Sequence, residues 1–193
     1  MPRAAALERA LRRSLDHWQL DSLPGHRCRK ILFNMQRIWP LVPPRVLSVV
    51  LRSNLNGWMT ARRFQGTGRC IMGCGRAVDS LKHYCHCPVY HGLCWQHLRL
   101  ERPEAAAAMS DFLLISPSSR QWRVDGPPQG GPAAAALRAL SVFALYSTHN
   151  AVRHGGDGER CAELFRSFLR EGARGHGPAA ALVSAVHKRR RRE

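Results

Sequence analysis

Apolar side chains recur every three to four residues along most of this chain, and this period predicts a mainly helical fold. Near the start, Leu7, Leu11 and Leu15 fall on one side of such a helix. Strand signals, which need strict alternation of apolar and polar residues, are scarce. The sequence therefore predicts helices over 4–20, 28–39, 44–55, 89–100, 104–115, 133–152, 158–171 and 178–187.

The clearest amphipathic stripe lies near the C-terminus, where apolar residues in 161–169 repeat at i, i+3, i+4, i+7 and i+8. Such a stripe is typical of a helix that buries one face. Asp157 is placed to cap this helix, and Gly172 is expected to end it. The preceding run over 133–152 is apolar on more than one side, which predicts a largely buried helix.

Breaks in these patterns predict four segments rather than one uniform array. Residues 116–132 are rich in Pro, Gly and Ser, which favours a linker. We expect basic N-terminal helices at 1–57, a Cys/His region at 58–100, a weak helix with the linker at 101–131, and C-terminal helices with a basic tail at 132–193.

The charge balance narrows the class of partner. Among 193 residues there are 30 Lys+Arg against 13 Asp+Glu, a formal net charge of +17. A balance this positive predicts a polyanionic partner, and nucleic acid is the commonest one. No stretch approaches 18 apolar residues and the first residues lack the apolar core of a signal peptide, so neither a membrane span nor secretion is expected.

Basic residues concentrate between Asp21 and Asp79, where 57 residues include ten bases and no acid. Trp39, Trp58 and Phe64 are interleaved with them; we expect both tryptophans in the core, because each ends an apolar helix. The pattern favours RNA or single-stranded DNA, held through phosphates without sequence preference. The predicted contact residues are Arg62, Arg63, Arg69 and Arg76, with Lys188, Arg189 and Arg190 in a basic tail that also suits nuclear import.

Five of the seven cysteines lie within 70–94, together with several histidines. The spacing Cys70-x3-Cys74, eight residues, His83-x3-Cys87 supplies two close pairs of the ligands that structural zinc prefers. Glycines around the first pair relieve the backbone there. With Asp79 as the cap of a helix that starts at Ser80, His83 and Cys87 would lie one turn apart on one face.

The choice of fourth ligand stays open at this point, because Cys85, His91 and Cys94 also lie within reach along the sequence. The alternative to a metal site is that these cysteines are buried thiols that pack as small apolar groups. A catalytic zinc is disfavoured, since such a site usually has a carboxylate base nearby, and Asp79 is the sole acid between Asp21 and Glu101.

The Cys/His region resembles the zinc knuckle that follows the polymerase domain of non-LTR retrotransposon reverse transcriptases. The residues that carry the resemblance are Arg63-Phe64, Cys70, Cys74, Asp79-Ser80, His83 and Cys87-Pro88. The first gap is one residue longer and the His–Cys gap one residue shorter than in that family. The resemblance implies a detached C-terminal piece that binds nucleic acid beside a separately encoded polymerase.

Neither the reverse transcriptase nor the nuclease that some of these elements carry is expected in this chain. A reverse transcriptase needs paired aspartates for its two metal ions, and no Asp-Asp pair occurs. We therefore expect a non-catalytic, zinc-containing nucleic-acid-binding module in the nucleus, with no small-molecule substrate. The alternatives are a zinc-stabilised helical module that binds a protein, and an enzyme that pairs Cys85 or Cys94 with a histidine.

Overall fold

The computed structural model describes residues 2–17, 24–65, 68–75, 77–115, 131–155 and 158–190. Within these ranges the chain is mainly helical, as the sequence predicts, and its β-structure is one isolated bridge. The helices are α1 (Pro2–His17), α2 (Pro24–Ile38), α3 (Pro44–Asn54), α4 (Leu81–Tyr84), α5 (Pro88–Leu98), α6 (Ala108–Phe112), α7 (Pro132–Arg153), α8 (Cys161–Ala173) and α9 (Gly177–Arg190), with single 3-10 turns η1 (Arg62–Phe64) and η2 (Gly158–Arg160).

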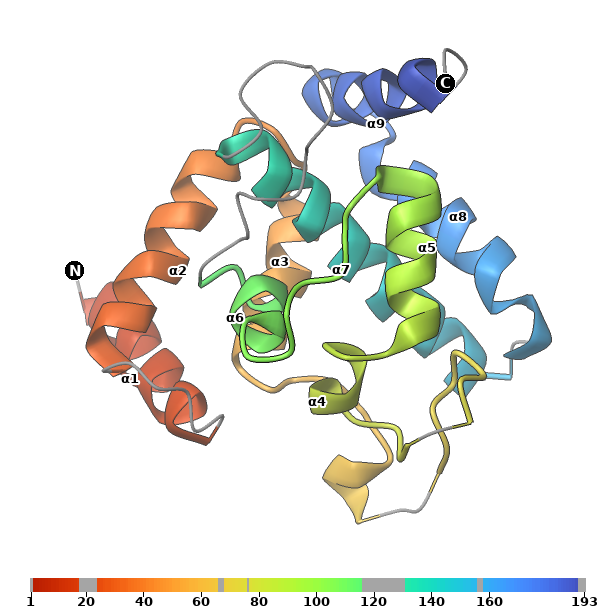
Figure 1. The fold of residues 1–193 in the computed structure, drawn as a ribbon. Helices are drawn as coiled ribbons and strands as arrows, with labels where there is room; N and C mark the ends of the chain where they lie inside the picture. The colour runs from red at the N-terminus through yellow and green to blue at the C-terminus, as the bar shows by residue number, and fades with distance from the viewer. Residues whose placement is uncertain are drawn as a thin grey trace.

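Helix α7 is the centre of the fold, and α2, α3, α5, α6, α8 and α9 all contact it (Figure 1). Pro132 opens it at a first-turn position, where the missing N–H costs no hydrogen bond. Its residues are then buried almost continuously from Ala134 to Leu145. A helix that is apolar on every side is stable only when other elements surround it, and this explains its central place.

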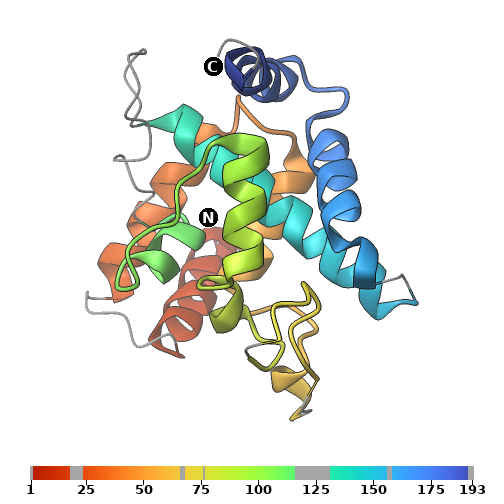
Figure 2. The ribbon, with the colours of Figure 1, turned by 45° about the vertical axis from the view of Figure 1, so that its right-hand side comes forward.

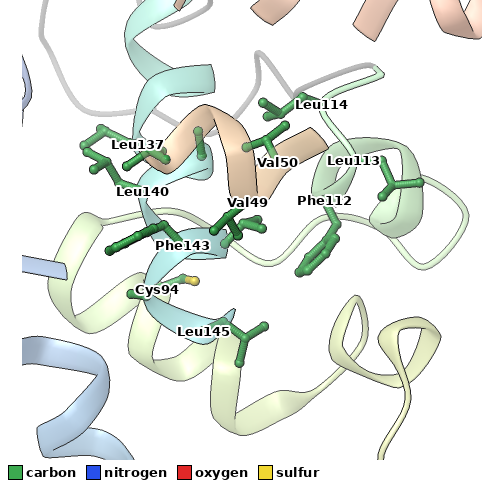
Figure 3. Close-up of a cluster of buried hydrophobic side chains, with 14 of the residues drawn as sticks. Val49, Val50, Cys94, Phe112, Leu113, Leu114, Leu137, Leu140, Phe143 and Leu145 are labelled. Carbon is green, nitrogen blue, oxygen red and sulfur yellow. The ribbon is translucent and has the colours of Figure 1, made fainter. Parts of the chain in front are cut away.

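Part of the hydrophobic core lies where α3, α6 and α7 meet (Figure 3). Val49 and Val50 come from α3, Phe112 from α6, and Leu140 from α7, all of them buried. One buried ion pair crosses this region: Arg138 Nε lies 2.7 Å from Asp111 Oδ2, and both side chains are almost fully shielded from water. Packing, with one neutralised polar contact, therefore joins the earlier helices to α7.

The stripe on α8 packs against α7, as its periodicity indicates, with Phe165 and Leu169 buried. Gly172 does not end the helix as we expected, because α8 continues to Ala173. A Cβ on Gly172 would lie 2.8 Å from the Phe143 ring. The glycine is thus required for the close approach of two helices and not for a stop.

Three further expectations need correction. Helix α2 starts at Pro24 and not at residue 28, because proline is well suited to a first turn. The weak helix expected over 104–115 is limited to Ala108–Phe112. Trp58 is 1% exposed, as expected, but Trp39 is 62% exposed, since it follows the end of α2 in a turn that carries it away from the core. Asp157, residues 116–130 and the last part of the first expected helix, residues 18–20, lie outside the described residues.

Candidate metal centre

We call residues 68–88 the Cys/His segment. Cys70 and Cys74 lie on the short antiparallel turn with which it begins. The Cys70 amide donates to the Ala77 carbonyl at 3.0 Å, and an isolated bridge pairs Arg69 with Val78. Gly73 has φ 72°, in the left-handed region that glycine adopts without strain. The chain can therefore reverse within the few residues that separate Cys70 from Cys74.

The second pair of residues is positioned by two helix ends. Ser80, and not Asp79 as expected, caps α4, because its Oγ accepts a hydrogen bond from the His83 amide at 3.1 Å. Cys87 also does not share a helix with His83, since α4 ends at Tyr84. Proline disfavours a helical residue before it, and Cys87 before Pro88 is extended and serves as the N-cap of α5.

The structure brings together the four residues that the spacing predicts, Cys70, Cys74, His83 and Cys87. Their ligand atoms all lie within 4.8 Å of one another. Cys70 Sγ is 3.9 Å from Cys87 Sγ, and Cys74 Sγ is 3.2 Å from His83 Nε2. Two sulfurs that bind one tetrahedral zinc at about 2.3 Å lie about 3.8 Å apart. The cluster thus has the dimensions of a four-coordinate metal site.

The three alternative ligands point elsewhere. Cys85 Sγ lies 3.4 Å from the Leu81 carbonyl, which accepts its hydrogen bond. His91 Nε2 lies 2.7 Å from the Cys85 carbonyl, where the ring must donate. Cys94 is fully buried in the main core (Figure 3). Burial raises the pKa of both the Cys85 and Cys94 thiols, so they stay protonated and pack as apolar groups.

Cys87 lies in an environment that favours its thiolate. A hydrogen bond from the Cys70 thiol lowers the pKa of Cys87, and the backbone amides of Tyr90 and Val89 at the start of α5 lower it further. Amide groups at a helix N-terminus stabilise negative charge. Because metals bind the deprotonated sulfur, this position is already suited to ligation.

Asp79 has a structural role that sequence reasoning missed. It is 2% exposed, and its carboxylate accepts hydrogen bonds from Tyr84 Oη at 2.5 Å and from the Ala61 amide at 2.8 Å. His149 Nε2 of α7 lies 3.2 Å away. Burial acts to raise the pKa of Asp79, but the hydrogen bonds from His149, Tyr84 and Ala61 outweigh it and hold the pKa below its usual value.

This network fixes the Cys/His segment to the helical body. Its sequence signal was the isolation of Asp79, a lone acid in a long basic stretch, which suggests a specific partner more than a helix cap. A second attachment comes from α8, where the buried Cys161 thiol donates to the Ile71 carbonyl at 2.9 Å. Polar contacts therefore join the Cys/His segment to both α7 and α8.

The predicted nucleic-acid contacts fall into three groups. Arg62, Arg69 and Lys188 are exposed. Arg63 donates from Nη1 to the Asn56 carbonyl at 2.9 Å, so it also holds the approach to the Cys/His segment. Arg76 lies outside the described residues, as do the side chains of Arg189 and Arg190.

Other members of the basic run stabilise the fold. Arg27 is buried at 4% exposure. Arg45 Nη2 donates to the carbonyls of Glu171 and Arg174 and so caps the C-terminal end of α8. Arg52 donates to Tyr146 Oη at 2.6 Å. The excess of arginine in this run is therefore partly an internal need for hydrogen-bond donors.

We found no match to the chain among protein-family models, curated proteins or solved structures. The resemblance to the retrotransposon knuckle accordingly stays a prediction. Across the described ranges, each helix is either too short or too polar for a membrane span.

Proposed function

We propose that this protein is a non-catalytic nucleic-acid-binding module of retroelement origin, with one structural zinc in the Cys/His segment. It would hold RNA or single-stranded DNA, without sequence preference, beside a separately encoded polymerase in the nucleus. The observation that carries this proposal is the solvent face of α2, where an exposed aromatic ring lies among basic side chains.

That face follows the helical period closely. Arg29, Lys30, Phe33 and Arg37 fall on one side of α2 and are exposed, while Cys28 and other apolar residues are buried on the opposite side. Phe33 is 57% exposed, and the Arg37 guanidinium carbon lies 5.4 Å from the centroid of its ring. No acid occurs in α2. Rings for base stacking beside cations for phosphates are the usual means of holding a single strand.

Zinc is the metal we propose for the cluster. Three thiolates and one imidazole are soft or borderline ligands, which suit zinc better than calcium or magnesium. Four protein ligands close a tetrahedral site and leave no position for water, as structural zinc requires. A non-catalytic role follows from this coordination, and the nearest buried carboxylate, Asp79, is already held by its own hydrogen-bond donors.

A protein-binding module is the second candidate. Two apolar helix faces in the sequence, over 133–152 and 161–169, could have bound a partner protein. The apolar faces of 133–152 and 161–169 pack against each other as α7 and α8, so they do not form a docking surface. What favours a protein partner is the exposure of Trp39 at 62% and of Trp95 at 48%. These rings are scattered over different elements, whereas the aromatic and basic groups of α2 share one face.

The salt dependence of binding tests the proposed function. Among the described members of the basic run, the exposed side chains not bonded to protein carbonyls or hydroxyls are Arg29, Lys30, Arg37, Arg62 and Arg69. With about five phosphate contacts, log affinity for a single strand should fall against log salt with a slope near −3.5. Fluorescence anisotropy with labelled RNA and DNA at several salt concentrations measures it. Affinity that ignores salt would support a protein partner instead.

Two variants separate the contributions of charge and stacking. Arg62→Ala with Arg69→Ala should make the slope shallower by about 1.4, because two phosphate contacts are lost. We choose Arg69 over Arg63, since Arg63 also binds main-chain carbonyls. Phe33→Leu should weaken binding by about 1–3 kcal/mol at every salt concentration and leave the slope unchanged. An unchanged affinity in Phe33→Leu would show that the α2 face does not stack bases.

A further inference from the structure

A groove with a volume of about 870 Å³ lies where α5, α8 and α9 meet, away from the α2 face and the Cys/His segment. Figures 1 and 2 place these helices together, with α9 at the end of the molecule opposite the Cys/His segment. His97 of α5, Arg166 and Arg170 of α8, Arg174 just after α8, and His187 of α9 contribute to its lining.

The arginines give this groove a positive charge. Three arginines and two histidines line it, and no Asp or Glu is among its lining residues. Arg166 and Arg170 are one turn apart on α8, an arrangement of like charges that destabilises a helix. The negative end of the α8 dipole favours Arg170, which lies in the last turn, but Arg166 lies a turn earlier. An anion in the groove would offset this repulsion.

The groove also has an apolar part and a suitable size. Ala173, Ala180 and Val183 contribute to its lining, between the arginines of α8 and His187 of α9. Arginine binds phosphate oxygens in a bidentate manner, and the apolar surface can contact a sugar or a base. Its volume falls within the range of small-ligand sites, which spans roughly 300–1,000 Å³.

We propose that this groove is a second phosphate-binding site, which takes the sugar-phosphate backbone of the strand that also contacts the Cys/His segment and α2. The identity of the ligand as a strand rests on the proposed function. Helix α5 connects the two sites: Cys87 is its N-cap, and His97 near its other end lines the groove. At about 1.5 Å per residue, α5 separates them by roughly 16 Å. A strand long enough to span that distance gains affinity by engaging both sites at once.

The test compares strand lengths in two matched variants. Arg166→Ser with Arg170→Ser removes two charges from the groove, and Arg9→Ser with Arg13→Ser removes two exposed charges at the same spacing from α1. For a single strand of about 16 nucleotides, the groove variant should bind at least tenfold more weakly than the wild type. For one of about 2 nucleotides, the loss should be about twofold or less, because so short a strand cannot span the distance between the sites. The α1 variant should lose equally little with both lengths.

Three outcomes decide the proposal. Equal losses of affinity in the two variants would show a general charge effect and overturn the proposal. A groove variant that binds the long strand as tightly as the wild type would also overturn it. Neither result would contradict the proposed function. If the wild type binds no strand at 50 mM salt, calorimetry with ADP separates the possibilities. ADP binding that is lost in the groove variant would retain the phosphate site and overturn the proposed function. Metal content and circular dichroism, unchanged in both variants, verify that the fold is intact.

Discussion

If the proposed zinc site is correct, replacing Cys74 by serine is expected to release the metal and to unfold the Cys/His segment. Serine is a poor zinc ligand, and the remaining residues provide three of the four positions of the tetrahedron. Structural zinc in small sites contributes about 10–16 kcal/mol of apparent binding free energy, and much of it supports local folding. The backbone of residues 68–88 has few other supports, since a single β-bridge and the four-residue helix α4 are its regular structure within the described part of the chain.

Elemental analysis of protein purified without added metal measures this effect. The wild type should carry close to one zinc per chain and Cys74→Ser close to none, with amide exchange in 68–88 becoming fast. Cys161→Ser is the matched control, because Cys161 is buried beside the segment but outside the cluster, and a serine hydroxyl can still donate to the Ile71 carbonyl. Full zinc retention in Cys74→Ser would refute the assignment of ligands.

The second large effect is expected for Asp79→Ala. Removing the carboxylate leaves the Tyr84 hydroxyl, the Ala61 amide and His149 Nε2 without their acceptor in a buried place. Each unsatisfied buried group costs about 1–3 kcal/mol, so the loss of the acceptor for all three should lower the free energy of unfolding by about 3–9 kcal/mol. Urea denaturation of the zinc-loaded protein measures the change, because it reports the difference at constant metal content.

Two companion variants make that result specific to the network. Ser80→Ala, next in sequence, removes only the cap of α4 and should cost about 1 kcal/mol. Tyr84→Phe removes one donor, so Asp79→Ala should cost less in that background than in the wild type, and the double-mutant cycle gives the coupling. A cost of Asp79→Ala no larger than that of Ser80→Ala would mean that the contact with α7 contributes little to stability.

That Cys70, Cys74, His83 and Cys87 lie close together could be predicted from the sequence, because the geometry that brings them together is local. A glycine-rich turn and a capped helix start act over a few residues, and they suffice to bring two close pairs together. The details that failed depend on more distant contacts or on one special residue. Asp79 was interpreted as a cap because its partner His149 lies 70 residues away in the chain. Cys87 left the predicted helix because Pro88 follows it.

The helical fold was predictable for a similar reason, since apolar period 3.6 is visible within a single helix. The periodicity of α8 also indicated its buried face, where Cys161, Phe165 and Leu169 are buried. It did not indicate that Gly172 is a contact with Phe143, because that requires knowledge of which helices pair. The basic run also did not indicate which arginines stabilise the fold. Arg45, for example, donates to the carbonyl of Glu171, which lies 126 positions later in the chain.

The late position of α7 in the chain matters while the protein is being synthesised. Helices α2, α3, α5 and α6 leave the ribosome first, yet each packs on α7, which is complete only after Arg153 has been added. Until then, the nascent chain exposes the apolar faces of α3 and α6, and Asp79 has no His149 to contact. A product that stops before residue 131 is expected to aggregate or to be degraded, even though it contains Cys70, Cys74, His83 and Cys87.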